Sequence, residues 1–421
     1  MKDWSASDRA NIWHPFSPLA GNEPLYVTHA KGLYLYTEDD RKIMDVISSW
    51  WVNVHGHSHP KIAKAIAKQA RELEHVIFAG FTHKPAIKLS ETLLELLPDD
   101  QSKVFYSDNG STATEVAIKL SIQYWFNQGK PRKKIIAIEG AYHGDTFGAM
   151  SVGDRTSIFN VPFTDFLFDV EYLPFPEGTG ENTLQAMKQL ATDEVAAFIF
   201  EPLVQGAGGM RMYSPEVLDQ LIEMAQASEI ICIADEVMTG FGRTGKTFAC
   251  DYVEHKPEIY CLSKGITGGF LPMGVTTVND RIAKAFDSTD KRKAFFHGHS
   301  YTANPMACAA ANASCKLLLK KKTQKAIARI SKTHQGFVDA FNPPDIVADV
   351  RCTGTILAVE LKADDPGYVS TIKDQIYAHF LEKEILLRPL GNVIYMIPPY
   401  IITDAELKLC YTAIEEFLAT L

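Results

Sequence analysis

The spacing of hydrophobic positions predicts helices that alternate with short buried strands over residues 60–265. Apolar residues recur at helical spacing over residues 60–75 and 85–97, and a proline begins the second segment. Five apolar runs flanked by turn residues predict buried strands, at residues 103–107, 134–139, 196–201, 230–236 and 259–264. Strands that alternate with helices pair in parallel and are covered on both faces. The pattern therefore predicts an α/β fold.

The two ends of the chain have a different pattern. Prolines at positions 15, 18 and 24 predict an irregular arm, and residues 32–46 predict two short strands around an acidic turn. Beyond residue 305, one helical run over residues 307–332 leads into a mixture of strands and helices. This change predicts a second, smaller α+β domain that begins near residue 310.

Composition and charge exclude several classes of protein. The chain has 421 residues, enough for two or three domains of about 150 residues each. Hydrophobic residues make up 46% and charged residues 22%, which argues against a disordered chain or a coiled coil. The net charge of −9 provides no general attraction to nucleic acid or anionic lipid. We therefore expect neither nucleic acid nor a membrane as a partner.

Cysteine usage and the first residues indicate the compartment. The seven cysteines are an odd number with no CxxC spacing, which argues against a disulfide framework and a zinc ribbon. The start of the chain, MKDWSASDRA, has no apolar segment, and no run of 18 apolar residues occurs. We therefore expect a cytoplasmic protein with reduced thiols.

One glycine-rich motif resembles a nucleotide-binding site. Residues 240–247, GFGRTGKT, match both the phosphate-loop pattern and the GxGxxG dinucleotide pattern. The preceding strand ends near Ala234, however, and the segment that follows is short and stopped by a proline. A connecting loop is therefore the preferred interpretation, and an ATPase is the alternative.

Three alternating histidines resemble a metal site. His55, His57 and His59 would share one face of a strand, as zinc ligands do. Gly56 and Pro60 favour a turn instead of a strand, and no matching cluster of cysteines or carboxylates supports a metal. We expect no metal site.

Three features near the ends of predicted strands carry the candidate chemistry. Gly110 and Ser111 lead from a strand into a helical segment, whose free backbone N–H groups can bind phosphate. Asp235 directly follows an apolar run, where a buried carboxylate needs a cation or a donor. Lys264 ends another apolar run, where desolvation lowers the pKa of an amine and makes it nucleophilic. Together they suit pyridoxal phosphate, which needs a lysine for its aldehyde, an acid for its ring nitrogen and a phosphate cradle.

The chain resembles the class III aminotransferases, which are fold-type I enzymes that use pyridoxal phosphate. The segments NGSTATEVAIK, GAYHGDTFGAMSVG, EPLVQGAGGM, IADEVMTGFGRTGK and LSKGITGG occur in the order of that family. The resemblance implies a large cofactor domain at residues 51–309 with a mainly parallel seven-stranded sheet. It also implies a smaller α+β domain at residues 310–421, while residues 1–50 form an arm and part of the small domain.

The resemblance implies catalytic and cofactor-binding roles for five residues. Lys264 would form the Schiff base and then transfer protons, and Asp235 would pair with the pyridine nitrogen. Gly110 and Ser111 would bind the phosphate, and Tyr142 would pack against the cofactor ring and the substrate. The catalytic residues would be Lys264, Asp235 and Tyr142.

The resemblance also assigns residues to the substrate and to a second subunit. Trp50 would line the substrate pocket, and Arg388 would bind a substrate carboxylate with its planar guanidinium. Gly298, His299 and Ser300 would come from the partner subunit, Gly298 facing the substrate and the other two the cofactor. These roles imply a homodimer with shared active sites that acts on small molecules.

Longer segments are similar to the members of the family that act in biotin biosynthesis. These are WHPF, SSWWVNVHGHSHP, HGHSYTANPMACAAA and RPLGNVIYMIPPY. They imply amino transfer to 8-amino-7-oxononanoate from S-adenosylmethionine or lysine; another class III ω-aminotransferase acting on diamines or amino-ketones is the alternative.

Three positions depart from patterns of the family. Ala207 stands where ornithine and γ-aminobutyrate relatives have a glutamate, which argues against those substrates. Phe16, expected at the substrate, replaces a tyrosine, and His299 replaces a proline. The last two changes are more similar to members that use lysine as the amino donor.

Overall fold

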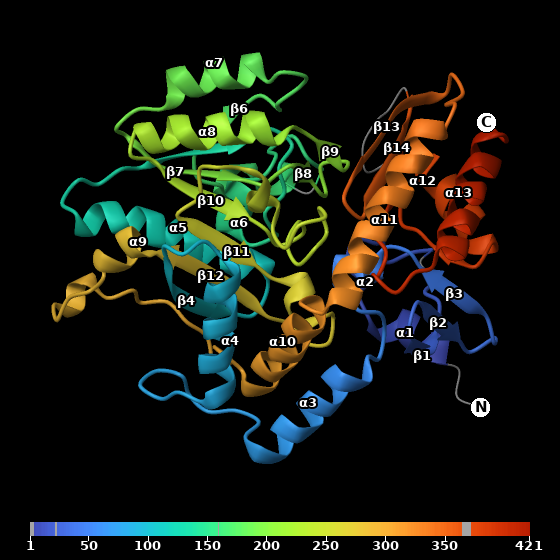
Figure 1. Ribbon diagram of the computed structural model, residues 1–421, viewed down its shortest axis with the longest axis horizontal. Coiled ribbons are helices and arrows are strands. Elements are labelled where there is room, and N and C mark those ends of the chain that lie inside the picture. Colours follow the sequence, from blue (N-terminus) through green and yellow to red (C-terminus); the bar gives the residue numbers. More distant parts are fainter. Residues whose placement is uncertain (1–3, 22, 159, 364–371) are drawn as a thin grey trace.

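The computed structural model describes residues 4–21, 23–158, 160–363 and 372–421, and a seven-stranded sheet is its largest layer (Figure 1). The strand order is β4-β12-β11-β10-β7-β5-β6. The strands are β4 (Gln101–Ser107), β5 (Lys134–Ile138), β6 (Glu171–Leu173), β7 (Val195–Phe200), β10 (Ile231–Asp235), β11 (Ile259–Leu262) and β12 (Gly274–Asn279). Only β12 runs antiparallel to its neighbours, so the other six point the same way. The predicted α/β fold with a mainly parallel sheet is confirmed.

All five predicted strands are present, and two further strands were not predicted from the pattern. β6 has only three residues. β12, with the sequence GVTTVN, is fully buried although two of its residues are threonines. Thr276 donates to the Ala113 carbonyl at 2.7 Å, and Thr277 donates to the Gln101 side chain at 2.8 Å. Because these hydroxyls find partners, a polar pair can lie inside the sheet where the pattern indicated no strand.

Strand pleating divides the core of the sheet into two layers. Ile231 and Ile233 of β10 pack with the apolar face of α5 (Gly110–Asn127). Cys232 and Ala234 point to the other face and join the cluster that contains α8 (Pro215–Ala227). Each central strand is therefore buried on both faces, which explains why these strands read as continuous apolar runs.

The remaining helices confirm most of the predicted helical segments. The segments predicted at 60–75 and 85–97 form α3 (Pro60–Glu72) and α4 (Lys84–Leu96). The other α-helices are α1 (Trp4–Asn11), α2 (Ser48–Trp51), α6 (Phe147–Ser151), α7 (Glu181–Leu190), α9 (Asp280–Lys284), α10 (Pro305–Leu318), α11 (Lys321–Ala340), α12 (Ile372–Glu382) and α13 (Asp404–Leu418). Short 3-10 turns are η1 (Val161–Phe166), η2 (Ala249–Tyr252), η3 (Lys264–Thr267) and η4 (Lys291–Lys293).

The prediction of one helical run over residues 307–332 is wrong. The run is divided between α10 and α11, and Lys320 between them is extended, with φ −69° and ψ 136°. Thr323 and Gln324 donate side-chain hydrogen bonds to the last carbonyls of α10, those of Leu317 and Leu318. Side chains thus replace the backbone bonds of a continuous helix, and no glycine or proline marks the break.

Two smaller sheets and a two-stranded ribbon complete the fold. One sheet contains β1 (Val27–Lys31), β2 (Tyr34–Thr37), β3 (Lys42–Asp45) and β15 (Ile385–Leu386), and it includes the two strands predicted within residues 32–46. The other contains β13 (Val347–Thr353), β14 (Ile356–Leu361) and β16 (Val393–Met396); the ribbon pairs β8 (Val204–Gln205) with β9 (Arg211–Met212). Because β15 pairs with β3, a strand from the C-terminal part of the sequence joins the sheet formed by the N-terminal strands. The domain boundaries at residues 50 and 310 stay a prediction.

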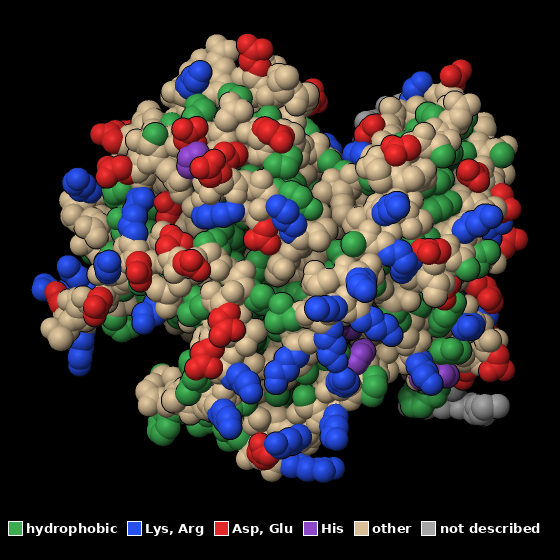
Figure 2. Space-filling view, viewed as in Figure 1, with side chains coloured by type: hydrophobic (Ala, Val, Ile, Leu, Met, Phe, Trp, Pro, Cys, Tyr) green, Lys and Arg blue, Asp and Glu red, His purple; other side chains and the backbone are tan. Residues whose placement is uncertain are grey.

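Surface charge is unevenly distributed. Figure 2 shows lysine and arginine side chains gathered over α3 and the start of α11. Among these, Lys61, Lys320, Lys322 and Lys325 line a surface cavity. No helix in the described part of the chain is long and apolar enough to cross a membrane.

We predict that Gly354→Ala lowers the free energy of unfolding by about 3 kcal/mol, near the upper range for single substitutions. Gly354 has φ +58°, and a Cβ there would lie 2.1 Å from the Thr244 carbonyl carbon. Denaturant unfolding measures the change. Gly336→Ala is the matched control, because Gly336 lies within α11 with open space around its Cβ position. The control should gain about 1 kcal/mol from helix propensity; equal stability of the two variants would contradict the close contact.

Candidate active site

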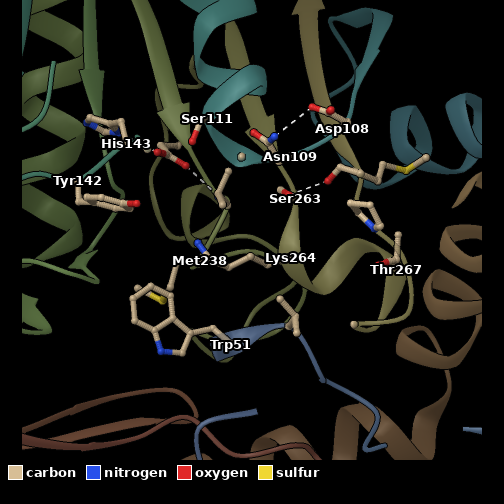
Figure 3. Close-up of a pocket in the computed structure, with 18 of the residues that line it drawn as sticks. Trp51, Asp108, Asn109, Ser111, Tyr142, His143, Met238, Ser263, Lys264 and Thr267 are labelled. Atoms are coloured by element: carbon tan, nitrogen blue, oxygen red, sulfur yellow. Dashed lines mark hydrogen bonds and ion pairs between the residues drawn. The ribbon is translucent and has the colours of Figure 1, made fainter. Parts of the chain in front are cut away.

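A cavity of about 360 Å³ lies where the carboxyl ends of the parallel strands meet (Figure 3). Its walls include residues that follow β4, β5, β7, β10 and β11. Ligands in open α/β sheets bind at this edge. Lys264, Asp235, Tyr142, Gly110 and Ser111 all line the cavity, so the structure brings these five predicted residues together.

The start of α5 forms one wall of the cavity. Asn109 caps the helix by accepting from the Thr112 amide at 2.9 Å, while Thr112 accepts from the Asn109 amide. The amides of Gly110 and Ser111 lie in the first helical turn, where no intrahelical acceptor exists. A Cβ at Gly110 would lie 2.8 Å from Cγ1 of Val237, so a larger residue would crowd this wall. The result is a turn of free donors with a positive dipole end, which favours an anion.

Asp235 is the last residue of β10 and is buried. Its Oδ2 lies 2.7 Å from Nδ1 of His143, and its Oδ1 accepts from the Val237 amide at 3.1 Å. The expected partner of the buried acid is therefore His143, which is within the recognised GAYHGDT segment but had no role assigned. His143 Nε2 is buried and has no partner among the described residues.

Lys264 follows β11 at the first position of a 3-10 turn, η3. The strand predicted at 259–264 is two residues too long, because β11 ends at Leu262. Lys264 has φ 44°, a conformation that is uncommon for residues other than glycine. Its Nζ lies 5.0 Å from the centre of the Trp51 ring, and Figure 3 shows the side chain extending between Trp51 and the start of α5.

Burial in the cavity makes Lys264 easier to deprotonate than a lysine in water. Burial lowers the pKa of Lys264, while the nearby charges of Asp235, Glu201 and Asp145 act in the opposite direction. This direction agrees with the expectation from the sequence. A lysine amine with a lowered pKa is a better nucleophile and proton acceptor.

Glu201 is a buried residue of the site that sequence reasoning missed. It follows β7 and accepts from the Tyr142 amide at 2.9 Å and the Gly206 amide at 2.8 Å. It therefore ties together two loops of the cavity wall. Burial raises the pKa of Glu201 to about 7, helped by Asp235 and opposed by His143 and the two amides. A carboxylate directly after an apolar run, in FIFEP, was the available signal.

The predicted substrate residues form a second group. The rings of Phe16 and Trp50 lie 5.2 Å apart in an edge-to-face arrangement. The Arg388 guanidinium lies 5.1 Å from the centre of the Trp50 ring, and Arg388 donates to the Phe16 carbonyl at 3.2 Å. Trp50 is directly followed by Trp51, which lines the cavity. The group formed by Phe16, Trp50 and Arg388 is thus joined to the cavity wall through the peptide bond between Trp50 and Trp51.

The predicted partner residues lie apart from the cavity of their own chain. Gly298, His299 and Ser300 are in the loop between η4 and α10, and none is among the described residues that line the cavity. Within the loop, the His299 amide donates to Thr302 at 3.1 Å. In a single chain the structure therefore does not bring them to Lys264.

The motif at residues 240–247 is a connecting loop, as the sequence analysis preferred. Between β10 and this loop lie four residues, and the 3-10 turn η2 follows it in place of a long helix. Arg243 within the loop is 1% exposed and donates to the carbonyls of Trp51 and Pro398 at 2.9 and 2.8 Å. The loop therefore supports the fold and does not present a phosphate cradle.

The three alternating histidines face different partners. His55 Nε2 lies 3.0 Å from the Ser314 carbonyl, and His57 Nε2 lies 2.8 Å from Asp45. His59 caps α3 by accepting from the Lys61 amide. Among the described residues no group of His, Cys, Asp or Glu side chains is arranged to hold a metal ion.

A primary amine, a buried acid and a helix start that can bind an anion lie around one cavity, and these are the groups that pyridoxal phosphate requires. A profile of the family described as Aminotransferase class-III matches residues 17–418. The chain belongs to this family and is a transferase of the pyridoxal-phosphate-dependent class.

Similar proteins cover nearly the whole chain. An adenosylmethionine-8-amino-7-oxononanoate aminotransferase from Synechococcus elongatus is 48% identical, over 97% of this chain and 98% of the relative. The crystal structure of an enzyme with the same name from Methanocaldococcus jannaschii has a TM-score of 0.94 at 34% identity, covering 99% and 98% of the two chains. An amine transaminase from an uncultivated Pseudomonas species, in its pyridoxal-phosphate-bound form, has a TM-score of 0.89 at 30% identity over 97% and 98%.

We predict that Glu201 makes the protein less stable as the pH rises from about 4.5 to about 7. Between pH 4.5 and 7 the Glu201 carboxyl is protonated in the folded state but ionised in the unfolded state. Raising the pH over this range therefore favours the unfolded state and lowers the free energy of unfolding. The loss attributable to Glu201 is up to ~3 kcal/mol. Denaturant unfolding of cofactor-free protein between pH 4.5 and 8 measures it.

Glu201→Gln should flatten this part of the pH dependence, whatever its effect on absolute stability. Glu223→Gln on the exposed face of α8 serves as the control and should leave the slope unchanged. An unchanged slope in Glu201→Gln would contradict the raised pKa.

Proposed function

We propose that this chain transfers an amino group from S-adenosylmethionine to 8-amino-7-oxononanoate, forming 7,8-diaminononanoate in biotin biosynthesis. One observation carries the proposal: two adjacent tryptophans connect the lysine cavity with a group that contains a guanidinium. Trp51 contacts Lys264, and Trp50 contacts Arg388. The names of the similar proteins from Synechococcus elongatus and Methanocaldococcus jannaschii support the same reaction.

The residues around the cavity suit pyridoxal phosphate. The helix start at Gly110 and Ser111 would hold the phosphate, and Asp235, oriented by His143, would hold the protonated ring nitrogen. Tyr142, whose backbone is tied to Glu201, would pack against the ring. When bound, the cofactor supplies an aldehyde that accepts amino groups and a ring that withdraws electrons.

Lys264 is the proposed catalytic acid and base. Its Nζ is the only lysine amine among the described residues that line the cavity. Because burial lowers its pKa, Nζ can take up a proton from a reacting carbon and return it to a neighbouring position. The cavity wall formed by Trp51 and Met238 limits access of water to this amine.

The second group suits the far end of the acceptor. 8-amino-7-oxononanoate has a carboxylate at one end, an apolar chain, and a ketone beside an amine at the other. Arg388 would bind the carboxylate, and Phe16 and Trp50 would contact the chain. Lys264 then faces the ketone end. This division explains why a cation and an amine are needed at separate places.

We also propose a homodimer whose subunits share active sites. Large apolar side chains are exposed on the isolated chain, among them Phe81 (61%), Phe166 (74%), Phe296 (78%) and Tyr301 (65%). Exposed apolar groups of this size favour burial against another chain. Phe296 and Tyr301 flank Gly298, His299 and Ser300, so a partner seated there would receive these three residues close to its own site.

We predict that kcat/KM for 8-amino-7-oxononanoate exceeds that for ornithine or γ-aminobutyrate by roughly 100-fold, because only the first matches the spacing of cation and amine. Steady-state assays measure this, with 8-amino-7-oxononanoate varied as the amino acceptor and ornithine or γ-aminobutyrate varied as the amino donor. Lys264→Ala should lose turnover and the visible absorption of bound cofactor. Lys246→Ala, in the connecting loop where Nζ contacts the Asp251 carbonyl, is the matched control and should keep both.

The outcomes separate the alternatives. Comparable turnover of diamines or other amino-ketones would indicate another ω-aminotransferase. Turnover by Lys264→Ala would contradict the role of that amine. Single-turnover reaction of the holoenzyme with each donor decides between S-adenosylmethionine and lysine, the second donor favoured by Phe16 and His299. Reaction with lysine alone would correct the donor and leave the acceptor proposal in place.

We predict that mixing two inactive variants restores activity. Gly298→Phe is tolerated within its own chain, since a Cβ there has only Thr302 within 4 Å, but it would fill the partner's substrate pocket. Random reassociation with Lys264→Ala gives mixed dimers with one intact site, hence about a quarter of wild-type activity. Sedimentation measures the dimer independently. Dimers without restored activity would show that each subunit completes its own site.

A further inference from the structure

The tryptophan pair lies on an unusual backbone. Ser48, Ser49, Trp50 and Trp51 of α2 have φ values of 52°, 44°, 69° and 75°. With the Trp51 amide bonded to the Ile47 carbonyl and the Val52 amide to the Ser48 carbonyl, these residues form one left-handed helical turn. Residues with a Cβ atom are disfavoured in this conformation, because Cβ approaches the following carbonyl oxygen. None of the four is glycine.

Asp45 holds the start of this left-handed turn. The carboxylate is 0% exposed. Oδ2 accepts from Ser49 Oγ at 2.7 Å and lies 2.8 Å from His57 Nε2, and Oδ1 accepts from the Ile47 amide at 3.2 Å. Both oxygens are therefore used, and two of the three contacts reach the turn or the residue before it.

Other segments hold the remaining part of the turn. Ser48 Oγ donates to the Ile397 carbonyl at 2.7 Å, and Arg243 donates to the Trp51 carbonyl at 2.9 Å. The Trp51 indole donates to the Tyr395 hydroxyl at 3.1 Å. These contacts come from distant parts of the sequence, so the turn depends on the assembled fold.

The left-handed turn directs the side chains of Trp50 and Trp51 to two different parts of the site. Trp50 packs between Phe16 and Arg388, whereas Trp51 packs over Lys264 and against Gly206. Successive side chains would be directed differently by a strand or a right-handed turn. The conformation therefore sets the relative position of the carboxylate end and the ketone end of the proposed acceptor.

We propose that the strained turn at residues 48–51 is a positioning device for the acceptor, and that Asp45 is the positioning residue that maintains it through Ser49. This inference rests on the proposed function, because Trp50 matters as a substrate residue only for a long acceptor with a distal carboxylate. Glycine would relieve the backbone strain of this turn, yet none of its four residues is glycine. We therefore infer that the turn needs side chains in defined positions.

Two substitutions at Ser49 test the device, since both remove the hydrogen bond to Asp45 but only one keeps the strain. In Ser49→Ala the bond is lost and the strained backbone remains, so KM for 8-amino-7-oxononanoate should rise about tenfold. In Ser49→Gly the strain at residue 49 is relieved as well. This variant should unfold roughly 2 °C above Ser49→Ala, yet bind the acceptor more weakly still.

Three further readouts separate positioning from catalysis. For both variants kcat, the visible absorption of bound cofactor and the half-reaction with the donor should stay within about twofold of wild type, because Lys264 is unchanged. Asp45→Asn keeps the shape but supplies only one acceptor oxygen, so its KM should also rise.

Asp40→Ala and Asp40→Gly are the matched controls. Asp40 has φ 61° in the exposed hairpin between β2 and β3 and takes no part in the cavity. The glycine variant should again be the more stable of the two, with KM unchanged in both. The Asp40 pair thus measures relief of strain alone.

The inference is overturned if Ser49→Gly binds the acceptor as well as wild type, or if the more stable Ser49→Gly has a lower KM than Ser49→Ala. Failure of the proposed function has a different signature, namely that the wild-type holoenzyme does not turn over 8-amino-7-oxononanoate at all. In that case the Ser49 variants would be compared on whichever acceptor the wild type uses, and an unchanged KM there would overturn the positioning role as well.

Discussion

The main constraint on this molecule is the burial of two ionisable groups, Lys264 and Asp235, at one end of the central sheet. Each buried group needs hydrogen-bond or charge partners to offset the loss of water. The structure resolves the constraint differently for each. Asp235 is satisfied by His143 and a backbone amide, so the acid can be buried without destabilising the strand. Lys264 packs against Trp51, and burial lowers its pKa although Asp235, Glu201 and Asp145 act in the opposite direction, which keeps the amine reactive. The cavity, the helix start and the loops tied by Glu201 surround these two groups.

The smaller sheets act on the chemistry through the backbone. β15 joins β3, and β16 leads directly to Ile397 and Pro398, whose carbonyls accept from Ser48 and Arg243. The ends of the chain therefore determine where the two tryptophans lie. A buried arginine in a loop with the pattern of a nucleotide site proves to be part of this support. Its role is to bond the carbonyls of Trp51, Ile397 and Pro398, which lie in two distant segments, not to bind a phosphate.

Departures from simple patterns occur where the fold supplies unusual partners. β12 is buried with two threonines because Ala113 and Gln101 accept their hydroxyls. The helical run after residue 305 breaks at Lys320 because Thr323 and Gln324 bond the last carbonyls of α10. The left-handed turn at residues 48–51 persists because Asp45, Arg243 and Ile397 hold it. In each case the deciding partner is distant in sequence or is not visible in hydrophobic periodicity.

Sequence by itself determined the α/β class, five central strands and the cavity residues Lys264, Asp235, Gly110 and Ser111, because apolar runs and the residues that end them are local signals. The resemblance to class III aminotransferases added Tyr142 to the cavity and predicted Trp50, Phe16 and Arg388 as substrate residues. Only the tertiary structure decided that His143 pairs with Asp235, that Glu201 ties the Tyr142 loop, and that adjacent tryptophans face different groups. These outcomes depend on contacts between segments far apart in the chain, and periodicity along one segment carries no information about them.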